Sequence, residues 1–189
     1  MKRACLAVFF AAMGAGLTAH AADDHVDPKA AAAAYDAAVA AHDRGDFVAS
    51  SRLFAEADSL APNPVALETA IRDAMLANLP DLAMNLVFRA RRVSSVPPAL
   101  EAAARDAEAK FASQVGVLRV LCDACTASLD QRRVTVDQDI AVLPGSHLVK
   151  IRVGDITEER PFKIGPTERV ELRPEHKTIK VDPTPDPDR

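Results

Sequence analysis

The chain has 189 residues and a formal net charge of −4, and 49% of its residues are hydrophobic. This acidic balance argues against nucleic acid as a partner, because phosphate binding needs a concentrated positive surface. The length predicts one medium domain or two small ones.

The N-terminus has the pattern of a secretory signal peptide over residues 1–21. Lys2 and Arg3 precede an apolar run from Ala4 to Leu17, and Ala19-His20-Ala21 supplies a small-x-small exit. The run is shorter than the roughly 20 residues of a membrane helix, although a retained anchor is the alternative. We expect export to the periplasm, the cell envelope or the medium, and no membrane span after cleavage. Cys5 should leave with the signal.

Residues 22–113 are expected to form a helical domain. Glycine is almost absent there, and alanine, the strongest helix former, is abundant. Five helices are predicted, beginning near residue 28, at Phe47, at Pro64, at Pro80 and after Pro97. The cluster Arg89, Arg91 and Arg92 is read as a solvated helix face.

The first helix pair resembles a tetratricopeptide repeat. Gly45 stands in the turn, Ser50 and Ala57 take small-residue positions, Phe54 takes a large one and Pro62 closes the repeat. Pro80-Asp81-Leu82 echoes the turn in a second copy. The resemblance implies a groove that binds an extended or helical segment of another protein. A plain helical bundle is the alternative.

Residues 114–174 are expected to form a small antiparallel β-sandwich. Strands are predicted near 116–122, 126–130, 133–136, 147–153, 160–164 and 169–173, several with apolar and polar residues in alternation. Asp137 and Asp139 are placed in a loop, where they would bind a cation weakly at most. Residues 175–189 end in a run of Asp and Pro that predicts a disordered tail.

This second part resembles the PEGA domain, a β-sandwich of bacterial exported and surface proteins. Leu143-Pro144-Gly145-Ser146-His147-Leu148-Val149-Lys150-Ile151 follows the family's L-x-P-G-x-H-x-V-x-V strand entry. Cys122-Asp123-Ala124-Cys125 stands where the family has its Pro-Glu-Gly-Ala turn. A covalent link between the cysteines would constrain that turn in place of proline and glycine.

Three chemistries compete for Cys122 and Cys125. A zinc site lacks a second ligand pair, and a haem attachment lacks the histidine, because residue 126 is threonine. A thioredoxin-like couple sits at a helix N-terminus, whereas this pair is predicted to join two strands. We therefore expect a structural disulfide, with a redox protein as the alternative.

No catalytic motif is recognised in the chain. Ser146 and His147 are neighbours on a predicted strand, so their side chains point to opposite faces and cannot act as nucleophile and base. The expectation is an α+β protein that is not an enzyme, has no cofactor and no metal, and serves as an exported adaptor for proteins. Cell-wall or carbohydrate binding by the sandwich is a further alternative, although the sequence offers it only Phe162 for stacking.

Overall fold

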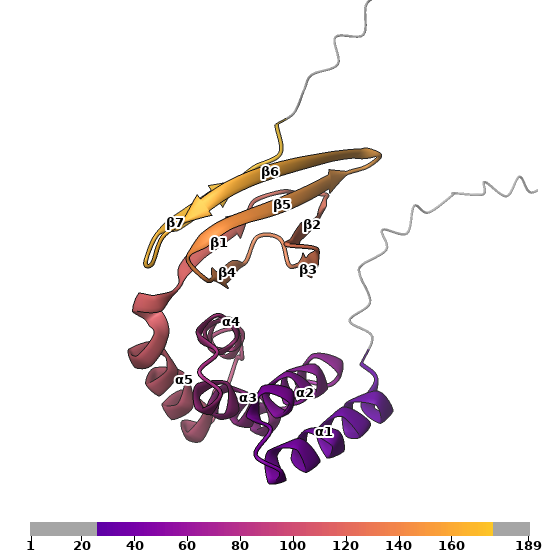
Figure 1. Ribbon diagram of the computed structural model, residues 1–189. Helices are drawn as coiled ribbons and strands as arrows, with labels where there is room; N and C mark the ends of the chain where they lie inside the picture. The colour runs from indigo at the N-terminus through magenta and orange to yellow at the C-terminus, as the bar shows by residue number, and fades with distance from the viewer. Residues whose placement is uncertain (1–25, 176–189) are drawn as a thin grey trace, which may run out of the picture.

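A computed structural model describes residues 26–175 of the chain (Figure 1). The predicted signal peptide lies outside these residues, as does all but the first residue of the predicted tail. Five helices come first and seven strands follow, so the α+β class expected from the sequence is confirmed. In Figure 1 the helices occupy one end of the molecule and the strands the other.

The five predicted helices are present, and their ends follow from the residues at their termini. They are α1 (Pro28–Asp43), α2 (Phe47–Leu60), α3 (Pro64–Leu76), α4 (Pro80–Ala90) and α5 (Pro98–Phe111). The carboxylates of Asp27 and Asp46 and the amide oxygen of Asn63 accept hydrogen bonds from the first turns of α1, α2 and α3. Proline opens four of the helices, where its missing N–H costs no hydrogen bond.

Small side chains let the helices pack closely. Ala38, Ala66, Ala70, Ala74 and Ala83 are fully buried in one core. Larger side chains from four helices, α2 to α5, fill the rest of that core: Phe54, Leu67, Ile71, Leu86, Leu100 and Phe111. The alanine content that predicts helices thus also sets how near their axes come.

The strands form two sheets. They are β1 (Gly116–Val120), β2 (Thr126–Leu129), β3 (Arg132–Val134), β4 (Asp139–Val142), β5 (Gly145–Val153), β6 (Ile156–Ile164) and β7 (Arg169–Leu172). One sheet has the order β4-β1-β7 and the other β3-β2-β5-β6. Both sheets contribute to a shared core of Leu118, Val120, Ala127, Ile140, Val142, Val149, Ile151 and Ile164.

Two expectations about the strands are wrong. Asp139 was expected to lie in a loop, but it is the first residue of the strand β4, which is antiparallel to β1. The arrangement is also not wholly antiparallel, because β7 pairs with β1 in parallel. A short strand after an acidic loop and a pairing between distant segments both lack a local sequence signal.

Gly116, the first residue of β1, lies against the end of β6. A side chain there would place its Cβ 2.7 Å from the backbone oxygen of Gly165 and 2.5 Å from the Ile164 side chain. The strand therefore approaches the end of β6 more closely than any other residue type allows.

Candidate functional site

The junction between the helices and the sheets is held by a pair of hydrogen bonds. Asn85 of α4 donates from Nδ2 to the carbonyl oxygen of Ala141 at 3.0 Å, and its Oδ1 accepts from the Ala141 N–H at 2.9 Å. Ala141 lies on β4, which is an edge strand of its sheet. The side-chain amide thus takes the place of a neighbouring strand at this point, so the edge is covered by α4.

Apolar contacts reinforce the junction. Phe111 and Val115, which lie on either side of the connection, are both buried in the helical core, of which Ala141 is also a member. Only the 3-10 turn Ala112–Gln114 separates α5 from the segment that leads into β1. A connection this short, with contacts on both sides, favours a fixed relative orientation.

A hollow of about 820 Å³ lies between the two parts, beside this junction. The ends of α2 and α4 line one side, and Thr135 and Gln138, which precede β4, line the other.

Arg89 is not the solvated side chain expected from the sequence: it donates to Asp58 Oδ2 and to the Ala55 carbonyl, both at 2.9 Å. Its positive charge is thereby matched, and it ties α4 to α2.

A second hollow lies on the first helical hairpin, where the sequence predicts a groove. It has a volume of about 330 Å³, and its lining includes Ala32 and Tyr35 of α1 and Ala57 of α2. The Tyr35 ring stands edge-on to Phe54, with the ring centres 5.1 Å apart. An aromatic ring fixed by packing, with small residues around it, suits an apolar side chain of a bound segment.

A buried polar cluster joins the first three helices. Asp73 of α3 is only 1% exposed. Its carboxylate lies 3.0 Å from His42 Nδ1 and accepts a hydrogen bond from Ser50 Oγ at 2.5 Å. The hydrogen bond to Asp73, together with its negative charge, raises the pKa of His42 above the ordinary value.

These three residue types do not form a nucleophilic triad. Ser50 and His42 both bond to the aspartate, so the histidine does not accept the serine proton, and Ser50 is fully buried. The cluster is instead a tie between α1, α2 and α3. The sequence reasoning missed it, although a polar residue inside the buried stripe of α3 is a usable signal.

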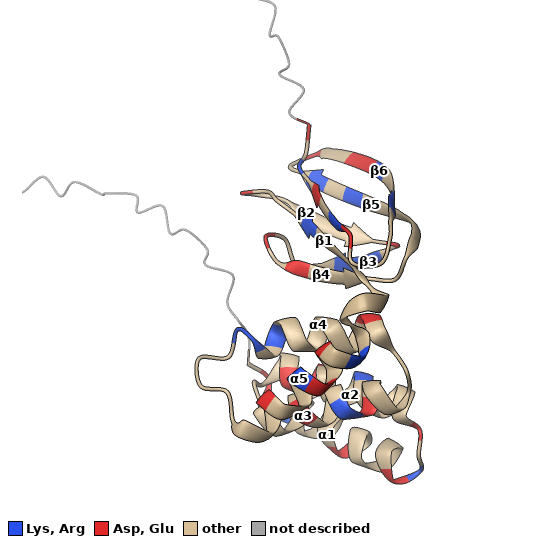
Figure 2. Cartoon of the chain, turned by 90° about the vertical axis from the view of Figure 1, so that its left-hand side faces the viewer, with Lys and Arg blue, Asp and Glu red and all other residues tan. Residues whose placement is uncertain are grey.

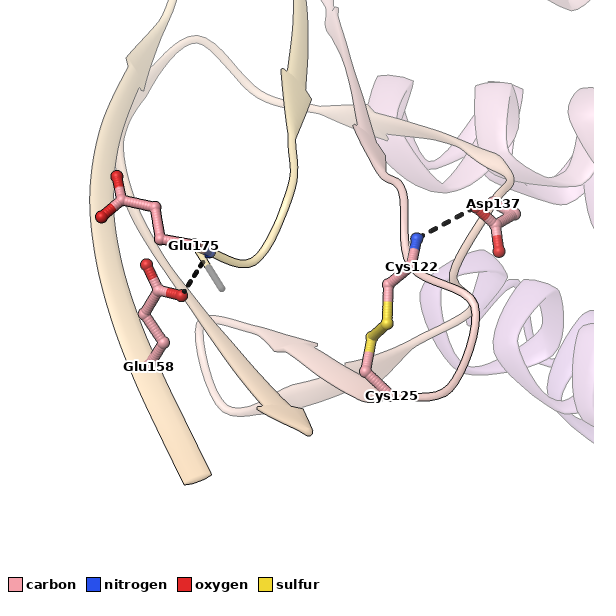
Figure 3. Close-up of a disulfide and its surroundings, with 5 residues drawn as sticks. All are labelled: Cys122, Cys125, Asp137, Glu158 and Glu175. Carbon is pink, nitrogen blue, oxygen red and sulfur yellow. Dashed lines mark hydrogen bonds between the residues drawn. A yellow bond between two sulfur atoms is a disulfide. The ribbon is translucent and has the colours of Figure 1, made fainter. Parts of the chain in front are cut away.

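Cys122 and Cys125 are joined as a disulfide in the turn between β1 and β2 (Figure 3), with Cα atoms 6.0 Å apart. The Cys122 N–H donates to Asp137 Oδ1 at 3.2 Å, which links this turn to the residues before β4. The pair therefore connects two strands, as expected, and does not begin a helix. A hollow of about 460 Å³ beside it is lined by the turn residues 121–124, by Asp137 and Val153, and by Arg173 and Pro174.

His147, which the sequence excludes as the base of a nucleophilic pair with Ser146, makes structural contacts at the start of β5. His147 Nδ1 lies 2.7 Å from Asp130 Oδ2, and its Nε2 lies 2.8 Å from the Leu143 carbonyl oxygen. Asp130 also accepts from the Leu148 N–H. The net pKa of Asp130 is lowered. Partial burial acts to raise it, but the hydrogen bonds to His147 and Leu148 outweigh that effect. His147 thus ties the start of β5 to the end of β2.

The carboxylates of Asp137 and Asp139, considered as weak cation ligands, bond to different protein groups: Asp137 accepts from the Cys122 N–H. Asp139 accepts two hydrogen bonds from Arg169 of β7 at 2.9 and 3.1 Å. These hydrogen bonds, opposed by partial burial, lower the pKa of Asp139. Within residues 26–175, no group of three or more His, Cys, Asp or Glu side chains is placed to hold a metal ion.

Comparisons of the chain with family models, with curated proteins and with solved structures find no match. Among residues 26–175, no helix combines the length and the apolar character that a membrane crossing requires.

Proposed function

We propose that this chain is an exported, non-enzymatic scaffold of the bacterial envelope. In this proposal the tetratricopeptide-like helical hairpins bind a segment of another protein, and the PEGA-like β-sandwich contacts a component of the envelope. The two parts act as one rigid body, so that the two partners are held at a fixed separation and orientation.

The exchange of two hydrogen bonds between Asn85 and Ala141 is the observation that carries the proposal. An enzyme needs a pocket with convergent reactive groups, whereas a scaffold needs surfaces that keep their relative position. Covering a sheet edge with a side-chain amide, beside the buried Phe111 and Val115, fulfils the second requirement. It also removes an edge that would otherwise pair with other chains.

The other polar clusters support the same reading. The carboxylate of Asp73 bonds two helices to a third, and His147 bonds two strands. His42 Nδ1, Ser50 Oγ and both ring nitrogens of His147 each face a protein partner. The disulfide between Cys122 and Cys125 plays a comparable part in the β1–β2 turn, as a brace that an exported protein can keep oxidised.

Site-specific crosslinking tests the proposal. A photoreactive phenylalanine analogue at Ala32, which lines the hairpin hollow, should give a discrete adduct with an exported protein in cells. The matched control is the same analogue at Ala37, an exposed alanine on the same helix that lies outside the hollow. The captured protein should bind the purified chain, and Tyr35→Ala should weaken that binding.

Defined outcomes would contradict the proposal. Equal adducts from positions 32 and 37, or no protein adduct from either, would contradict binding in the hollow. Turnover of insulin disulfides by the purified chain would contradict the non-enzymatic assignment.

A further inference from the structure

The outer face of the sheet β3-β2-β5-β6 alternates cations with hydroxyl groups. In the strand register Ser128 stands between Arg133 of β3 and Lys150 of β5. In the next row Arg152 stands between Thr126 and Thr157. Their neighbours along the strands, such as Val149 and Ile151, are buried in the core, so these six residues share the solvent side.

This face is positive on a chain whose net charge is negative. Lys150 forms an ion pair of 2.7 Å with Glu159 of β6, and Lys163 adds a further cation along β6. Among residues 26–175, no carboxylate lies within ion-pairing distance of Arg133 or Arg152. Figure 2 shows the basic positions of β5 in blue beside an acidic position of β6 in red.

The six residues are not spread over a flat surface but line one hollow of about 390 Å³. Its lining consists of Thr126, Ser128, Arg133, Lys150, Arg152 and Thr157, without an apolar or acidic side chain. From strand geometry, Arg133 and Lys150 are about 10 Å apart at Cα and Lys150 and Arg152 about 7 Å. Ser128 therefore lies between two cations, and Arg152 lies between two hydroxyl groups, at separations that admit a ligand.

We propose that this hollow binds carboxylate groups of an acidic glycan chain. Each guanidinium presents a planar fork of donors that matches a carboxylate, and the hydroxyl groups between the cations match the hydroxyl groups of the sugar rings. This deepens the proposed function, on which it rests, by giving the envelope component a chemical class.

The same features disfavour other anionic partners. An acidic peptide that adds to a sheet does so at a strand edge, whereas four of the six lining residues lie on β2 and β5, which are paired on both sides. Single-stranded nucleic acid needs aromatic side chains for base stacking, and the hollow has none. A membrane surface is bound by apolar residues that enter it together with charge, and this lining is polar throughout.

Titration calorimetry of the oxidised chain of residues 22–189 tests the site. Oligogalacturonate is the probe, and its methyl ester is the matched ligand without charge. Arg133→Ala and Arg152→Ala should each weaken binding about tenfold, since hydrogen bonds to charged groups carry most of the affinity. Lys163→Ala removes the same charge from the same face outside the hollow and should change affinity less than about twofold.

Four results would overturn the proposal: no binding of oligogalacturonate, equal binding of its methyl ester, equal binding of polyglutamate of the same charge, or equal losses in Lys163→Ala and the arginine variants. Stronger binding to phosphatidylglycerol vesicles would assign the face to lipid instead. The crosslink from Ala32 reports on the other partner, so it persists in Arg133→Ala and Arg152→Ala if only the glycan site is at fault.

Discussion

Asn85 and Ala141 are 56 residues apart in the chain, yet the side chain of one satisfies both backbone groups of the other. This reciprocal contact lies where the helices meet the edge strand β4. The relative position of the two parts therefore depends on a single amide group together with the apolar core around Val115.

Asn85→Ala should lower the free energy of unfolding by about 1–3 kcal/mol, because it leaves the N–H and C=O of buried Ala141 without their partner. Urea unfolding measures the loss, and the Ala141 amide should exchange its hydrogen faster. Gln114→Ala is the control, since that exposed side chain donates only to the Lys110 carbonyl within its own turn. An unchanged stability and exchange rate in Asn85→Ala would show that the pair holds nothing together.

Replacing Cys122 and Cys125 by serine should reduce stability by about 2 kcal/mol, the chain-entropy value for so short a loop. In the oxidised chain of residues 22–189, titration should find no free thiol, because these two are its only cysteines. The doubly substituted chain should still fold and bind its partner. Two reactive thiols after oxidation would remove the brace and favour the redox alternative.

The pKa of His42 should lie above the usual range in the native state, because Asp73 bonds to it and stabilises its charged form. The resulting stability is fully present below the pKa of the unfolded histidine and is lost as the pH rises through the folded pKa. Proton resonances of the imidazole ring measure the titration.

Two variants separate the causes of that shift. Asp73→Asn should bring the pKa of His42 back toward its ordinary value, whereas Asp43→Asn removes a smaller contribution and should lower it less. Equal effects of the two substitutions would contradict a specific hydrogen bond between His42 and Asp73.

Protonation of Asp139 should lower the stability of the sheets. Its pKa is lowered by the hydrogen bonds from Arg169, so its contribution is present above the unfolded pKa and is lost as the pH falls through the folded pKa. Arg169→Gln should raise the pKa of Asp139 and flatten the loss of stability in acid. Arg105→Gln is the control, since that exposed arginine pairs only with Glu101 one turn away in α5.

The sequence predicted the helices well because their signals are local. Asn63-Pro64 caps and opens α3, and Pro80 opens α4, within a few residues of where each helix begins. The disulfide could also be predicted from the sequence, because Cys122 and Cys125 are three residues apart in a predicted turn. In each case the residues that carry the signal lie inside the element they define.

The parts that were missed depend on distant partners. β4 is short, and the parallel pairing of β1 with β7 joins segments about fifty residues apart. Nothing near Asn85 in the chain indicates that its amide will meet Ala141. The same holds for Asp73, whose burial makes sense only with His42 and Ser50 beside it.

Rigid coupling of the two parts is tested most directly by a distance between them. Nitroxide labels at Ala109 of α5 and Lys163 of β6, both exposed, allow pulsed electron resonance to record the distribution of separations. Rigid coupling predicts one narrow distribution for the native junction and a broad one for Asn85→Ala. A broad distribution in the chain with Asn85 intact would mean that the parts move independently, and the proposed scaffold would fail.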